Sequence, residues 1–104
     1  MKIILSPLAE WKIEQLLNYL EIEWSKKSRD KYLEILLKAF NQVSKNPNSS
    51  PASTEHPNLY KRVVTKQSSF YYRILNDRIE IIDLIDNRQN PNSIQAEIEK
   101  FFGN

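Results

Sequence analysis

The chain has 104 residues, a formal net charge of +2 and 40% hydrophobic residues, with one histidine and no cysteine. This length suits one domain, expected to span residues 1–104, and the lack of thiols excludes a disulfide framework and argues against a Cys/His zinc site. No apolar run is long enough to cross a membrane, so we expect a cytoplasmic protein. We also expect no metal site and no cofactor.

The first half predicts a strand followed by two antiparallel helices. Residues 2–5 are β-rich, and Ser6 followed by Pro7 is typical of a helix start. Ser28 can cap a second helix, which Asn46-Pro47 ends because proline disfavours helical geometry in the residue before it. Apolar residues recur at helical spacing in both segments: Ala9, Ile13, Leu16, Leu17, Leu20 and Trp24 in the first, and Tyr32, Leu36, Phe40 and Val43 in the second.

The second half predicts three short antiparallel strands, within residues 59–66, 69–75 and 78–91. Asn76-Asp77 joins the last two, and both residues tolerate the positive φ that a tight hairpin needs. After Pro91, apolar residues fit a short C-terminal helix. The predicted fold is therefore α+β in the order β-α-α-β-β-β, with the helical hairpin packed on a small antiparallel sheet.

The hairpin turn also predicts which face of the sheet each side chain occupies. It places Arg73 opposite Glu80 and Tyr71 opposite Ile82. The core face then carries Phe70, Tyr72, Ile74, Ile79, Ile81 and Ile85, and the open face carries Tyr71, Arg73, Glu80, Ile82, Leu84 and Asp86. Asp83 falls on the core face by this parity, which only a sheet edge or a β-bulge would explain.

This order of elements resembles the RelE/ParE superfamily of toxins from type II toxin–antitoxin modules. The resemblance covers nearly the whole chain, and its most specific parts are three runs in the last third: Tyr72-Arg73-Ile74, Ile79-Glu80-Ile81-Ile82 and Asp86-Asn87-Arg88-Gln89-Asn90-Pro91. It implies a growth-inhibiting toxin that is neutralised by a cognate antitoxin, which often binds an apolar groove between the toxin's helices and its sheet.

The resemblance leaves the target open between two classes. RelE-like relatives cut messenger RNA on the ribosome, a reaction that needs cations on the phosphate and groups that transfer protons. ParE-like relatives inhibit DNA gyrase. Here Ser69 lies near the place of a catalytic arginine in RNA-cutting relatives, and Asp86 lies where many relatives have histidine. These departures favour the ParE side. The alternatives are a ribosome-dependent mRNA endonuclease and an inactive relative that only binds a partner.

The candidate site residues follow from that reading. Phosphate or target contacts are expected from basic and neighbouring residues of the strands: Lys61, Arg62, Lys66, Tyr71, Arg73, Asp86 and Arg88. Antitoxin contacts are expected from Ile82 and Leu84 on the open face. Each has an ordinary structural explanation, such as an Arg73–Glu80 cross-strand pair or lysines that protect an edge strand. His56 is expected to be exposed in a loop, and Trp11 and Trp24 to pack inside.

Overall fold

The computed structural model describes residues 1–54, 56, 58–87, 96 and 98. Its elements are β1 (Lys2–Leu5), α1 (Pro7–Glu23), α2 (Lys26–Lys45), β2 (Tyr60–Val63), β3 (Ser68–Ile74) and β4 (Arg78–Asp86). The predicted α+β fold and element order are confirmed, whereas the predicted C-terminal helix lies outside the described residues.

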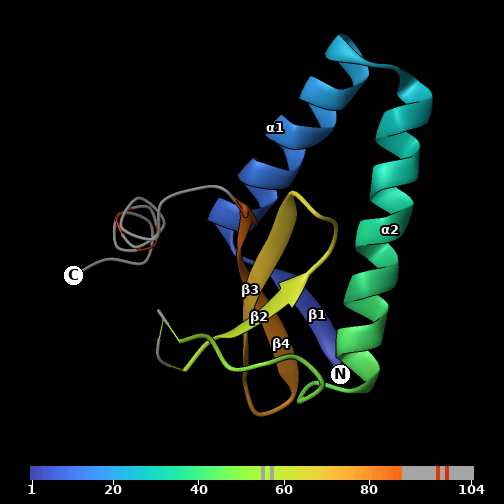
Figure 1. The fold of residues 1–104 in the computed structure, drawn as a ribbon. Coiled ribbons are helices and arrows are strands. Elements are labelled where there is room, and N and C mark those ends of the chain that lie inside the picture. The colour runs from blue at the N-terminus through green and yellow to red at the C-terminus, as the bar shows by residue number, and fades with distance from the viewer. Residues whose placement is uncertain (55, 57, 88–95, 97, 99–104) are drawn as a thin grey trace.

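The four strands form one sheet in the order β1-β4-β3-β2, with the helical hairpin beside it (Figure 1). The sheet is mixed, because β1 runs parallel to β4 while the other two pairs are antiparallel. The first strand therefore lies beside the last one. The chain between them crosses over through the two helices, as a parallel connection requires.

Two serines begin the two helices. Ser6 accepts a hydrogen bond from the Ala9 amide at 3.0 Å and precedes Pro7, as predicted. Ser25, rather than Ser28, caps α2 and accepts from the Ser28 amide at 3.0 Å. The prediction for Ser28 was wrong because α2 begins one turn earlier, directly after a very short connection from α1.

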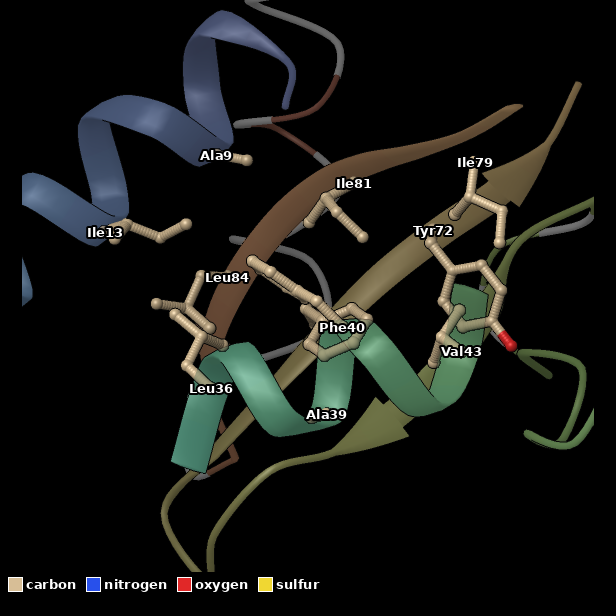
Figure 2. Packing of buried hydrophobic residues seen from close by; sticks show 11 residues of the cluster. Ala9, Ile13, Leu36, Ala39, Phe40, Val43, Tyr72, Ile79, Ile81 and Leu84 are labelled. Atoms are coloured by element: carbon tan, nitrogen blue, oxygen red, sulfur yellow. The ribbon is translucent and has the colours of Figure 1, made fainter. Parts of the chain in front are cut away.

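The hydrophobic core fills the space between the helical hairpin and one face of the sheet (Figure 2). Phe40 of α2 meets Phe70 of β3 edge to face, with ring centroids 5.0 Å apart. The core cluster consists of Ala9, Ile13, Leu36, Ala39, Phe40, Val43, Phe70, Tyr72, Ile79, Ile81 and Leu84. Helical spacing predicted Ala9, Ile13, Leu36, Phe40 and Val43 of this set correctly.

A β-bulge in β4 reverses the predicted faces beyond Ile81. The register shifts between Tyr71 and Tyr72, so that Tyr71 pairs with Asp83 and Tyr72 pairs with Ile81, leaving Ile82 as the extra residue. Tyr71 was therefore wrongly placed opposite Ile82. One inserted residue moves every later side chain to the other face.

The consequences of the bulge are visible in three side chains. Leu84, predicted on the open face, belongs to the main core, whereas Ile85 belongs to a second cluster on the far face. Asp83 is fully buried, and its carboxylate lies 3.6 Å from the Lys12 ammonium of α1. The bulge thus resolves the position of Asp83 that simple alternation could not explain.

The far face of the sheet is not open either. Tyr71, Ile82 and Ile85 form the second buried cluster, against which Leu59 and Ile98 pack. His56 is only 5% exposed and meets the Tyr71 ring edge to face at 4.9 Å, so the prediction that it is exposed was wrong. The loop before β2 carries His56 onto this face.

The β3–β4 hairpin forms where predicted, but with a different backbone. The Leu75 amide donates to the Arg78 carbonyl at 2.8 Å. Neither Asn76 nor Asp77 has a positive φ; among the non-glycine residues described, only Asn58 does, at 70°.

Candidate functional site

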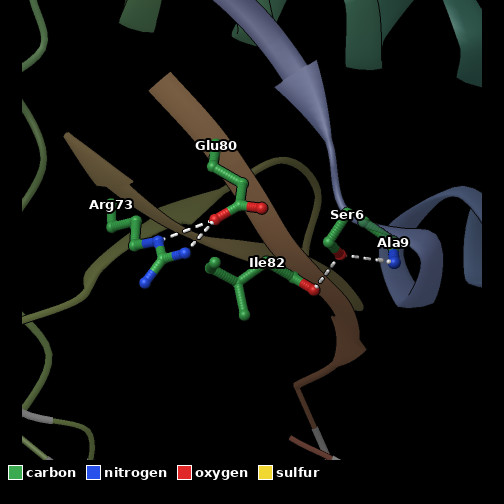
Figure 3. A network of polar contacts seen from close by, with 5 residues as sticks. All are labelled: Ser6, Ala9, Arg73, Glu80 and Ile82. Atoms are coloured by element: carbon green, nitrogen blue, oxygen red, sulfur yellow. Dashed lines mark hydrogen bonds and ion pairs between the residues drawn. The ribbon is translucent and has the colours of Figure 1, made fainter. Parts of the chain in front are cut away.

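Arg73 is held by Glu80 on the neighbouring strand, as the turn predicted. The Arg73 Nε and a terminal guanidinium nitrogen both lie 2.6 Å from the same Glu80 oxygen, Oε1 (Figure 3). The arginine side chain is 48% exposed and the glutamate side chain 15% exposed. The pair neutralises much of the charge that Arg73 would offer to a phosphate, although the guanidinium still has a free edge toward solvent.

Lys61 and Arg62 lie on β2, at the edge of the sheet. They are half-buried, and as neighbours on a strand they project to opposite faces. Arg62 binds the amide oxygen of Gln42 on α2. Both line a shallow hollow of about 580 Å³ beside the loop Ser49–Thr54. Lys66 lies exposed in the turn after β2, away from Arg73 on the other end of β3. Among the described candidates, Lys61 and Arg62 therefore border the same hollow, but their side chains leave β2 on opposite faces and do not form the wider basic patch.

Tyr71 and Ser69 are both enclosed. Tyr71 is 2% exposed beneath His56, so its ring face is not available for stacking on a base. Ser69 is fully buried and its hydroxyl donates to the Asn87 Oδ1 at 2.5 Å. Asp86, in contrast, is exposed at the end of β4. Arg88 lies outside the described residues.

A groove of about 740 Å³ lies between the helical hairpin and the ends of β3 and β4. We call it the hairpin groove. Its walls are formed by α1 and its C-cap, by α2, by the β2–β3 turn and by the ends of β3 and β4: Lys12, Gln15, Leu16, Tyr19, Leu20 and Trp24; Tyr32; Thr65 and Gln67; Ser68; and Leu84, Ile85 and Asp86. Most of this lining is apolar, with polar groups at the strand end.

Hydrogen bonds fix the polar end of the hairpin groove. The Tyr32 hydroxyl and the Thr65 hydroxyl each lie 3.0 Å from the Ser68 hydroxyl. Asn87 holds the turn from the other side, since its amide nitrogen donates to the Thr65 and Lys66 carbonyls. Burial raises the pKa of Tyr32 above its ordinary value, so its phenol is neutral at physiological pH.

The antitoxin candidates divide between two places. Leu84 lines the hairpin groove while belonging to the core, whereas Ile82 is buried on the far face. Ile82 does not line the hairpin groove, because its side chain packs in the cluster on the far face of the sheet. The expectation that Trp11 and Trp24 pack inside was also wrong, since they are 51% and 72% exposed.

Sequence reasoning missed the exposure of three apolar side chains on α1 and at its C-cap. Tyr19 is 55% exposed, Ile22 is 78% exposed and Trp24 is 72% exposed, all near the tip of the hairpin. Ile22 lies outside the stripe of apolar residues that helical spacing assigned to the core. An apolar residue outside that stripe was the available signal, because such a residue stays exposed when the stripe packs on the core.

Residues 3–91 match the model of a protein family described as "ParE toxin of type II toxin-antitoxin system, parDE". The chain belongs to the ParE toxin family. It is therefore the toxin component of a type II toxin–antitoxin system, and a cognate antitoxin is its implied partner. The resemblance noted from the sequence is confirmed at the level of the family.

Two solved structures share the fold of this ParE-family toxin. A chain from a chromosomal ParDE toxin–antitoxin system of P. aeruginosa superposes with a TM-score of 0.72 at 11% identity, covering 83% of this chain and 95% of that one. A YoeB/ParE toxin from Agrobacterium tumefaciens gives 0.63 at 15% identity, covering 84% and 99%. No curated protein sequence matches the toxin.

Within the described parts of the toxin, neither helix is long and apolar enough to cross a membrane. Across the same residues, histidine and the acidic side chains do not gather in any group of three that could hold a metal ion.

Proposed function

We propose that this toxin arrests growth by inhibiting DNA gyrase rather than by cutting messenger RNA. The observation that carries the proposal is how the candidate side chains are placed on the strands of the sheet. RNA cleavage needs cations and proton-transferring groups that converge on one phosphate. Of the described candidates, Arg73 is engaged by Glu80 and Tyr71 is buried, while Lys61 and Arg62 project to opposite faces of β2.

Ser69 and Asp86 add to this argument. In RNA-cutting relatives an arginine and a histidine are expected near these positions. Here the Ser69 hydroxyl is fully buried and bonded to Asn87, so it cannot reach a substrate. Asp86 is exposed but carries negative charge, which would repel a phosphate.

The test of this proposal uses two readouts on the same toxin. Purified toxin added to gyrase and relaxed plasmid is expected to reduce supercoiling, and induced cells are expected to filament while translation continues. Primer extension on a translated message is the opposing readout. Cuts inside codons at the ribosomal A site, with supercoiling unaffected, would overturn the gyrase assignment in favour of an mRNA endonuclease.

The cognate antitoxin binds the hairpin groove through the apolar face of a helix. Tyr19 and Trp24 offer large aromatic surfaces on the groove wall, and both are more than half exposed in the free toxin. Aromatic side chains that become buried in this way dominate the binding energy of protein interfaces. The proposed antitoxin site does not include Ile82, because its side chain faces the other side of the sheet.

Trp24→Ala tests the antitoxin site. We expect the toxin to stay folded and its affinity for the antitoxin to fall about 30-fold or more, as for a hot-spot aromatic. Trp11→Ala is the matched control, since Trp11 is exposed on α1 but does not line the groove. Unchanged affinity of Trp24→Ala together with weakened binding of Trp11→Ala would move the interface to the outer side of α1.

A further inference from the structure

The outer face of α2 carries a row of lysines. Lys27, Lys31, Lys38 and Lys45 are separated by four, seven and seven residues, a spacing that keeps side chains on one side of a helix. All four are exposed. With a rise of about 1.5 Å per residue, the row is about 27 Å long. We call it the α2 lysine row.

This row faces away from the rest of the molecule. The opposite side of α2 presents Leu36, Phe40 and Val43 to the sheet (Figure 2). Because the lysines lie on the side opposite that core stripe, they stand over solvent rather than over the hairpin groove. A ligand bound along the row would leave the groove accessible to an antitoxin.

The two helices differ strongly in charge. The α1 helix has four acidic residues and one lysine, whereas α2 has six basic and two acidic residues. The chain as a whole carries only +2. Its positive charge is therefore concentrated on one helix, and four of the six basic residues of that helix lie on one face. Two acidic residues fall between these lysines along the helix: Glu34 lies within the row and Asp30 lies beside it.

From this arrangement we infer that the α2 lysine row is a binding surface for the phosphate backbone of duplex DNA, independent of any sequence. The centres of protein–protein interfaces are rich in aromatic residues and poor in lysine. The row has lysines and no aromatic side chain, while the exposed aromatics gather on α1. Phosphate backbones are recognised mainly by lysine and arginine charges.

A duplex fits the row better than a single strand. Surfaces for single-stranded nucleic acid combine positive charge with aromatic platforms on which bases stack. No such platform lies on the outer face of α2. A straight helix of this length instead matches the rigid, closely spaced phosphates of a duplex, which carries one charge per about 1.7 Å.

The salt dependence of binding tests the inference with toxin and DNA alone, so its outcome does not depend on gyrase. Fluorescence anisotropy on a labelled 30-base-pair duplex is measured across salt concentrations. If the four lysines each displace about one counterion, the slope of log K against log[salt] is about −3.6. Lys31→Gln combined with Lys38→Gln should reduce the magnitude of that slope by about 1.8.

Matched variants separate the row from overall charge. Lys2→Gln combined with Arg78→Gln removes the same charge from an exposed pair on β1 and β4, and should leave the slope unchanged. Glu34→Gln should strengthen binding severalfold, a gain that misfolding cannot produce.

Three outcomes would overturn the inference. The first is the absence of salt-dependent duplex binding by the unmodified toxin. The second is an equal loss in the α2 and β1/β4 double variants, which would reduce the effect to net charge. The third is equal or tighter binding of poly-glutamate or of single-stranded RNA at the same charge concentration.

Discussion

Ser6 performs two structural tasks with one hydroxyl, and replacing it should reveal both. Its Oγ accepts from the Ala9 amide at the start of α1 and donates to the Ile82 carbonyl at 2.7 Å, at the bulge of β4 (Figure 3). Ser6 is 1% exposed, so water is poorly placed to substitute for either bond. The hydroxyl therefore ties the beginning of the hairpin to the irregular strand.

Ser6→Ala should lower the free energy of unfolding by about 2–4 kcal/mol. Loss of the helix cap costs about 1 kcal/mol. The buried Ile82 carbonyl left without its partner costs about 1–3 kcal/mol more. Urea unfolding followed by circular dichroism measures the sum, as a lower midpoint with an unchanged slope.

Ser25→Ala is the matched control for the second bond. Ser25 caps α2 in the same way, but its hydroxyl otherwise contacts only the neighbouring Ser28 hydroxyl at 3.1 Å. Its loss should cost about 1 kcal/mol. If Ser6→Ala is no more destabilising than Ser25→Ala, the bond to Ile82 contributes nothing net, and the argument that Ser6 anchors the bulge is refuted.

Further predictions concern three ionisable groups. Lys12→Met should destabilise the toxin by about 3 kcal/mol, because it strips an ion pair from the fully buried Asp83, and Asp83→Leu in the same chain should recover most of the loss in urea unfolding. Stability should fall as pH rises above about 10, because the raised pKa of Tyr32 keeps the phenol neutral in the folded state while the unfolded phenol ionises first. In thermal melts, Tyr32→Phe should reduce this loss of stability at alkaline pH. Arg73→Ala should change the free energy of unfolding by less than about 1 kcal/mol, because the Arg73 side chain is 48% exposed and solvent screens its ion pair with Glu80; a larger loss would make Arg73 architectural.

Periodicity predicted the helices and their buried stripes because each helix packs on a single core. Ala9, Ile13, Leu36, Phe40 and Val43 all lie where helical spacing placed them. The strand order along the chain was equally accessible, as β-rich runs separated by polar residues indicate strands. The family resemblance rested on these same elements, and the match over residues 3–91 agrees with it.

Two features of the site could not be predicted from local sequence patterns. The bulge at Ile82 inserts one residue without any glycine or proline to announce it, so the faces of Leu84 and Ile85 were exchanged. The burial of His56 depends on how a loop folds over the far face of the sheet, which is a tertiary contact. Two of the predicted site residues, Tyr71 and Ile82, were therefore placed on a surface that the protein covers.

The pairing of β1 with β4 has a consequence for synthesis. The register joins Leu5 to Ile81, so the first strand has no partner strand in the sheet until the last one is made. Most of the chain must leave the ribosome before the sheet can close, and contacts this distant in sequence slow folding. The helical hairpin is built from local contacts and can form first, whereas the sheet is complete only after the final strand has been made. A ribosome that stalls before residue 78 would hold a nascent chain with a helical hairpin but no folded toxin.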